Sequence, residues 1–148
     1  MPENTPDTQI TITMNLEQAE AVSAALDLYT RIGLGDLSEI ADLARMGKLN
    51  MRKHDGHRPV DIESIENMEE LLLSAKALLG HPRNGSFGIG HQGVDIDARR
   101  AYEMKKSLDK ALWSHKRPGD NSTVHSTGLT VRYTQDPAPT AQVLLPSG

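Results

Sequence analysis

The chain has 148 residues, a net charge of −4, no cysteine and only 3% aromatic residues. This length fits one domain, and the missing cysteines exclude disulfides, thiolate metal sites and cysteine nucleophiles. Lysine and arginine are scattered rather than gathered into a basic stripe, so we expect no nucleic-acid partner. The chain lacks an apolar run long enough for a membrane span, and its acidic, polar start is not typical of a signal peptide. We therefore expect a cytoplasmic protein without a membrane partner.

The composition also predicts how the domain is bounded. Residues 1–8 are polar with two prolines and predict a flexible arm, followed by a single α+β domain over residues 9–134. Residues 135–148 contain three prolines and predict a tail, in which residues 142–145 form either a final edge strand or a segment that docks on a neighbouring subunit. With few aromatic residues, the core must rely on small and aliphatic side chains. Such a thin core favours a homo-oligomer, in which a subunit interface completes it.

Two helices are expected in the first third of the chain. Apolar residues recur every three or four positions over about residues 16–32, directly after Asn15, a capping residue with Gln18 three positions on. Asp36 is expected to begin a second helix, which Gly47 ends.

Two longer helices are expected further along the chain. Asp61 begins a helix that reaches about Leu79, and its apolar residues lie on more than one side, which favours a central position in the fold. The segment after this helix is rich in glycine. Residues 48–60, before the helix, are polar and predict an exposed loop. Asp95 then begins a fourth helix over about residues 96–115.

Short strands are expected at both ends of this helical block. Ile10–Met14 alternates apolar and polar residues, and so does Leu129–Tyr133, with a weaker strand at 123–126. The sequence therefore predicts an α+β fold, mainly helical, in which four helices are flanked by an N-terminal strand and one or two C-terminal strands. These strands are expected to form a small sheet.

The segment of residues 83–93, here called the glycine loop, is the strongest candidate for a site. It holds four glycines and the only phenylalanine, between two helices. Glycines let a backbone approach a ligand closely, arginines neutralise an anion, and aromatic rings stack on a base. The segment has no Gly-Lys-Ser/Thr and no preceding strand, so it is neither a P-loop nor a Rossmann turn. The candidate ligand-binding residues are Arg83, Asn84, Ser86, Phe87, His91, Arg99, Arg100 and Tyr102.

A structural role for the same loop is the alternative. Its glycines suit tight turns, and Phe87 and Ile89 would then plug the core. Asp95 and Asp97 also place negative charge at the helix start, which disfavours a phosphate there. Both interpretations stay open.

The remaining polar residues give weaker signals. His54-Asp55-Gly56-His57 offers metal-ligand side chains, but it lies in a polar loop rather than on a helix face, so we expect no metal and no cofactor. The serines lack a nucleophile-elbow context, and we assign no catalytic residue.

Three segments resemble one known family. Ala25-Leu26-Asp27-Leu28-Tyr29-Thr30-Arg31-Ile32-Gly33-Leu34-Gly35, then Asn84-Gly85-Ser86-Phe87-Gly88-Ile89-Gly90, then Ala98-Arg99-Arg100-Ala101-Tyr102-Glu103 resemble small uncharacterised proteins of tailed bacteriophages and prophages. The likeness covers roughly residues 10–115. The family usually has a proline after this loop, where this chain has His91-Gln92-Gly93.

The resemblance implies a function by analogy. Small phage proteins of this build include inhibitors of bacterial immunity, and some are oligomeric sponges that sequester nucleotide second messengers. We therefore expect a non-enzymatic anti-defence protein that binds a small anionic, nucleotide-like ligand in the host cytoplasm. The alternatives are a phage accessory protein that inhibits a host protein by direct binding, and a small hydrolase or lyase with His57 or His91 as general base.

Overall fold

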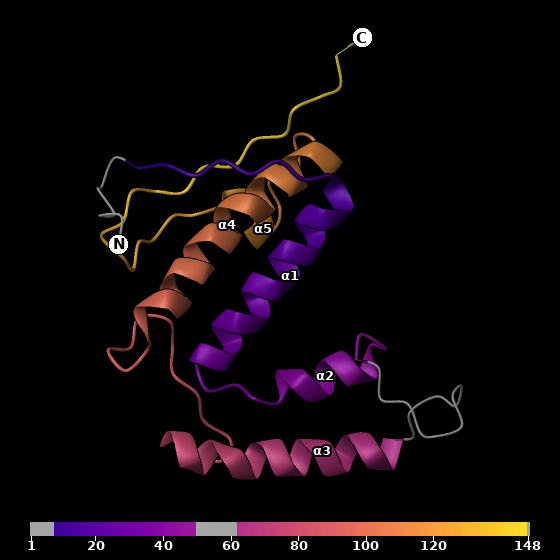
Figure 1. Cartoon of the computed structure of the whole chain (residues 1–148), viewed down its shortest axis with the longest axis vertical. Helices are drawn as coiled ribbons and strands as arrows, with labels where there is room; N and C mark the ends of the chain where they lie inside the picture. Colours follow the sequence, from indigo (N-terminus) through magenta and orange to yellow (C-terminus); the bar gives the residue numbers. More distant parts are fainter. Residues whose placement is uncertain (1–7, 50–61, 148) are drawn as a thin grey trace.

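The computed structural model describes residues 8–49 and 62–147 (Figure 1), and every secondary-structure element in these two ranges is helical. The elements are α1 (Leu16–Gly33), α2 (Glu39–Arg45), α3 (Ile62–Ala75), the 3-10 helix η1 (Lys76–Leu79), α4 (Ile96–Lys116) and α5 (Val124–Thr127). The expected first and fourth helices are confirmed almost to the residue, whereas the second is shorter than predicted.

The capping residues explain why these two helices were predictable. The Asn15 side chain accepts a 2.8 Å hydrogen bond from the Gln18 N–H, and the Gln18 side chain accepts a 2.9 Å bond from the Asn15 N–H. This reciprocal pair fixes the first turn of α1. Asp95 similarly accepts from the Asp97 N–H at the start of α4. The expected capping residue of α3, Asp61, lies outside the described residues.

Helices α1 and α4 form an antiparallel pair at the centre of the structure (Figure 1). At one end, Glu20 near the start of α1 forms an ion pair with Lys116 at the end of α4. At the other end, Gly33 closes α1 so tightly against α4 that an added Cβ would lie 2.5 Å from the Ala98 Cβ. Gly33 therefore sets the distance between the helices as well as ending α1.

Helices α2 and α3 form a second layer across one end of this pair (Figure 1). Its buried core consists of Ala41 and Ala44 from α2 and Ile65 from α3, with partly buried apolar neighbours around them. Helix α3 contacts α2 and η1, but neither α1 nor α4. The predicted central position of this helix is therefore wrong: α3 lies at the edge, and Leu71 and Leu78 are 73% and 88% exposed.

The predicted small sheet is wrong, because the described residues contain no strand. Residues 8–14 are extended without a strand beside them, and 124–127 form α5 instead of the weaker strand. In the segment 129–133, the Tyr133 N–H donates to the side chain of Glu103 rather than to a neighbouring strand. The alternating pattern therefore belongs to an extended segment that the Glu103 side chain of α4 holds in place.

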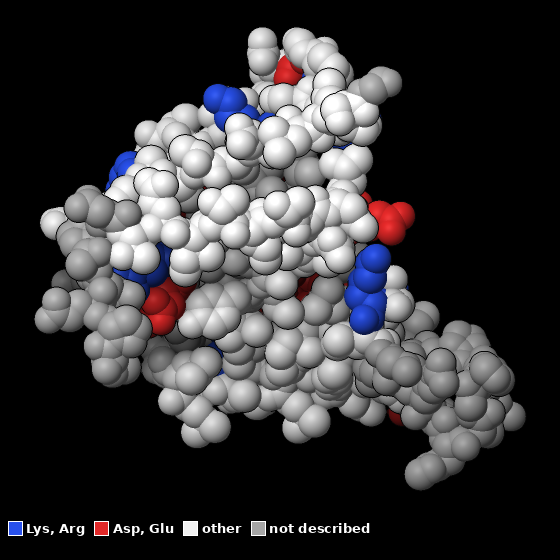
Figure 2. Space-filling model, turned by 45° about the horizontal axis from the view of Figure 1, so that its top comes forward, with Lys and Arg blue, Asp and Glu red and all other residues white. Residues whose placement is uncertain are grey.

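Figure 2 shows Lys, Arg, Asp and Glu side chains at separate points around a mostly uncharged face. Among the helices of the described ranges, none combines the length and the apolar character needed to cross a membrane. Most of the predicted loop 48–60, including His54 and His57, lies outside the described residues.

Candidate functional site

The glycine loop packs against the end of α1 through Phe87. The Phe87 N–H donates a 2.8 Å hydrogen bond to the Leu34 carbonyl, which anchors the loop on the chain just after α1. The Phe87 ring stacks on His91 with centroids 3.9 Å apart, and it meets His81 edge-on at 4.4 Å. Gly35 lies directly beneath the His81 ring, where a Cβ would overlap it. Phe87 thus has ring partners within its own chain, but it is only partly buried and is not one of the buried core residues. Its role toward a ligand stays a prediction.

Two of the predicted arginines are engaged on different sides of the loop. One guanidinium nitrogen of Arg83, Nη2, donates to both carboxylate oxygens of Glu70 in α3, at 2.5 and 2.6 Å, and both side chains are about half exposed. Arg99 donates a 2.6 Å hydrogen bond to the His91 carbonyl, which ties the loop to the first turn of α4. The structure therefore brings Phe87, His91 and Arg99 together, while Arg83 is turned toward α3. Asn84 and Ser86 lie exposed on the loop between them.

The third predicted arginine is neutralised by carboxylates. Arg100 donates to Asp136 at 2.8 Å and to Asp97 at 3.0 Å. Its hydrogen bonds to Asp136 and then to Asp97 are the main reason that the pKa of the guanidinium is raised above its ordinary value. An anionic ligand would have to displace one of these carboxylates to reach Arg100. Because all three groups are well exposed, such ion pairs are individually weak.

A cluster of four residues lies where the glycine loop meets α4 and the C-terminal segment. We call Gly90, Tyr102, Lys106 and Tyr133 the tyrosine cluster. The two tyrosine rings meet edge to face, with centroids 5.7 Å apart and planes at 73°. The Lys106 ammonium lies 5.5 Å from the Tyr102 centroid, and a Cβ at Gly90 would lie 3.3 Å from the Tyr133 ring. Burial raises the pKa of Tyr102, so its phenol stays neutral and keeps a proton to donate.

Two residues of this cluster, Lys106 and Tyr133, were not selected by the sequence analysis. Tyr102 and Lys106 are four residues apart on a helix, so their contact follows from helical periodicity. Tyr133 was interpreted only as a strand residue, and no local signal connects it to Tyr102. The fold brings it there because the segment after α5 runs back along α4.

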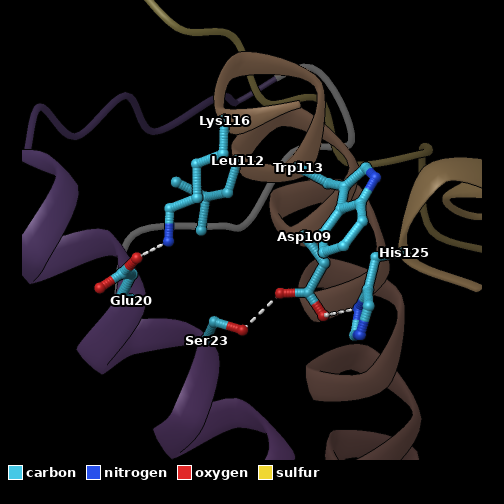
Figure 3. Close-up of a pocket in the computed structure, with 7 residues that line it drawn as sticks. All are labelled: Glu20, Ser23, Asp109, Leu112, Trp113, Lys116 and His125. Atoms are coloured by element: carbon cyan, nitrogen blue, oxygen red, sulfur yellow. Dashed lines mark hydrogen bonds and ion pairs between the residues drawn. The ribbon is translucent and has the colours of Figure 1, made fainter. Parts of the chain in front are cut away.

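A small pocket in the described part of the chain lies between α1, α4 and α5 (Figure 3). It encloses about 190 Å³, and Asp109 lies at its centre. The Oδ1 atom of Asp109 accepts a hydrogen bond from Ser23, and its Oδ2 atom accepts one from Lys105. The His125 Nδ1 lies 3.7 Å from the same Oδ2 atom. The lining residues are Glu20, Ser23, Asp109, Leu112, Trp113, Lys116 and His125.

The geometry of this cavity argues against a catalytic triad. The Ser23 hydroxyl donates to Asp109 and not to His125, so the imidazole does not lie between the serine and the carboxylate as it does in a triad. The Trp113 ring already has two neighbours, because His125 stacks on it at 5.5 Å and the Arg117 guanidinium lies 5.0 Å from it. Pockets for small molecules usually enclose about 300–1,000 Å³, so this cavity is small for a nucleotide. Its polar contacts serve to join three helices.

Within residues 8–49 and 62–147, the His, Asp and Glu side chains form no group of three or more that could hold a metal ion. The sequence motif that offered such ligands, 54–57, lies outside these ranges.

Comparisons with protein-family models, with curated proteins and with solved structures found no match to this chain.

Proposed function

We propose that this chain is a non-enzymatic binding protein that captures a small anionic ligand with a planar ring, such as a nucleotide, at the tyrosine cluster. The observation that carries the proposal is the position of Lys106 over Tyr102. Unlike Arg83 and Arg100, Lys106 has no carboxylate within ion-pair distance among the residues that the structure describes. Its charge is therefore available to an anion.

The neighbouring groups suit the rest of such a ligand. Two phenol rings offer an apolar surface for a base, and phenol hydroxyls offer hydrogen bonds at its edge. The glycine loop reaches the cluster at Gly90, where the backbone carries no side chain that would keep a ligand away. Stacking is thus assigned to Tyr102 and Tyr133, while Phe87 holds the loop. His91 directly follows Gly90 in the loop, and Arg99 donates to the His91 carbonyl.

Isothermal titration calorimetry with cyclic nucleotides and ADP-ribose derivatives tests the proposal. We expect micromolar binding that Lys106→Ala weakens about tenfold or more, as expected when one charge-assisted hydrogen bond is lost. Lys48→Ala is the matched control, since it removes an exposed lysine near the end of α2 and should leave binding unchanged. If none of these ligands binds at micromolar concentration, or if both variants behave alike, the proposal fails.

The same preparation separates sequestration from turnover. A ligand that is recovered intact by chromatography after the protein is denatured supports a sponge, whereas a cleaved ligand supports the hydrolase or lyase. The anti-defence role in a phage-infected cell rests on the resemblance of the sequence. It stays a prediction. Inhibition of a host protein also stays a prediction, and a stoichiometric partner in a pull-down from bacterial lysate would support it.

A further inference from the structure

Helix α3 has a wide apolar arc, of which α2 covers only one half. Ile65, Met68 and Leu72 pack toward the small core with α2. Beside them, Leu71, Ala75 and Leu78 follow at spacings of four and three residues and so form a second stripe along α3 and η1. This second stripe is exposed at Leu71 (73%) and Leu78 (88%).

The layer that carries this stripe has an incomplete core. The side chains buried between α2 and α3 are two alanines and one isoleucine. Because α3 touches neither α1 nor α4, the main helix pair adds no apolar cover to it. Two short helices with so little buried apolar surface are marginal alone, since helical stability comes mainly from packing of an apolar face. A further layer of helix on the Leu71–Leu78 stripe would complete this core.

The arrangement of the stripe indicates what covers it. A small residue, Ala75, lies between two leucines, so a twofold axis at Ala75 would seat Leu71 of one copy beside Leu78 of the partner subunit. This is an isologous contact in which the Ala75 residues of the two copies face each other, so that the helices can approach closely and the flanking leucines of the two copies pack side by side.

The charges on α3 agree with this occupant. Three of its four glutamates, Glu63, Glu66 and Glu70, follow their own three- and four-residue spacing and form a separate stripe. The fourth, Glu69, pairs with Arg45 at the end of α2. Glu70 is in addition paired with Arg83. Antiparallel packing on the leucines therefore does not press like charges against each other, whereas a basic partner peptide would be expected to use the acidic stripe instead.

We infer that a second copy of this chain covers the stripe, so that the α2–α3 layers of two copies pack into one four-helix core. This inference does not depend on the proposed ligand, because the tyrosine cluster belongs to α4, the glycine loop and the C-terminal segment. Each chain would keep its own ligand site.

Sedimentation velocity over a wide range of protein concentrations tests the inference. We expect a wild-type dimer, and a monomer for the double variant Leu71→Glu/Leu78→Glu. Both leucines are exposed in the single chain, so the variant should keep the helical content of the wild type by circular dichroism. The control is Leu144→Glu/Leu145→Glu, which alters two leucines of similar exposure (74% and 72%) in the C-terminal segment and should remain dimeric.

Cross-linking gives an independent readout, because the chain has no native cysteine. Ala75→Cys would lie at the twofold axis and should form an intermolecular disulfide on mild oxidation. Ala77→Cys, an exposed alanine on the acidic side of the helix, should not. A wild-type protein that is monomeric at every concentration overturns the inference and leaves the stripe to a foreign partner. A dimer that persists in Leu71→Glu/Leu78→Glu, or equal cross-linking of the two cysteine variants, overturns it as well.

Discussion

The carboxylate of Glu103 accepts a 2.7 Å hydrogen bond from the backbone N–H of Tyr133, thirty residues further along the chain. The Glu103 side chain is only 3% exposed, yet it lies on α4 in a protein without a large core. Arg132 donates to the same carboxylate at 3.0 and 3.2 Å, and Thr134 donates through both its N–H and its hydroxyl. One buried acid therefore fixes the C-terminal segment and, with it, the Tyr133 ring of the tyrosine cluster.

Replacing this acid should destabilise the fold. Glu103→Gln keeps the size of the side chain but removes the charge, and the amide nitrogen cannot accept the bonds that one carboxylate oxygen receives. We expect a loss of about 2–3 kcal/mol in the free energy of unfolding, as is typical when a buried charge-assisted network is broken. Urea unfolding measures it. Glu66→Gln, on the exposed side of α3, is the control and should change stability by less than about 0.5 kcal/mol. Equal effects of the two substitutions would contradict the role assigned to Glu103.

The same acid should give the protein a defined sensitivity to low pH. Burial alone would raise the pKa of Glu103, but the hydrogen bonds from Arg132, Thr134 and Tyr133 outweigh burial and lower the pKa to about 2. The unfolded chain takes up this proton near pH 4.5. The stabilisation by Glu103 is therefore complete above pH 4.5 and is lost as the pH falls from there toward 2, by about 1.4 kcal/mol per pH unit.

Urea unfolding of the wild type and of Glu103→Gln at several pH values checks this dependence. Other acids titrate in both proteins, so the difference in stability between them isolates Glu103. That difference should be constant above pH 4.5 and shrink below it. A difference that stays constant down to pH 2 would show that Glu103 has an ordinary pKa.

The contact between the loop and α1 predicts a special requirement at Gly35. This residue has φ = 90°, a conformation that glycine adopts without strain, and an added Cβ would overlap the His81 ring. We expect Gly35→Ala to cost at least about 1–2 kcal/mol and to loosen the stacking of His81 and Phe87. Gly88 lies in the glycine loop, and nothing lies within 4 Å of a Cβ added there, so Gly88→Ala should be close to neutral. Thermal unfolding of both variants decides this, and a neutral Gly35→Ala would argue that the loop does not pack as described.

The local signals of the sequence predicted the long helices and missed the arrangement of the extended segments. Asn15 with Gln18, and Asp95, are complete signals within one helical turn, so the start of α1 and of α4 could be predicted. By contrast, the alternation in Leu129–Tyr133 is equally consistent with a strand and with any extended segment that has one buried side. Only the fold decides whether its N–H groups meet a strand or the carboxylate of Glu103.

The predicted ligand residues show the same division. The sequence could select Tyr102 and the glycine loop, because they are close in the chain and unusual in composition. It could not indicate that Phe87 packs between two histidines, that Arg83 and Arg100 are paired with carboxylates, or that Lys106 lies over Tyr102 beside Tyr133. Each of these depends on which distant residues the fold brings near.

By itself, the sequence determined the caps, the long helices and the position of the unusual loop, because these depend on contacts within a few residues. The tertiary structure decided the edge position of α3, the absence of a sheet in the described residues and the composition of the tyrosine cluster. These depend on packing and on hydrogen bonds between segments up to thirty or more residues apart, such as the one that joins Glu103 to Tyr133.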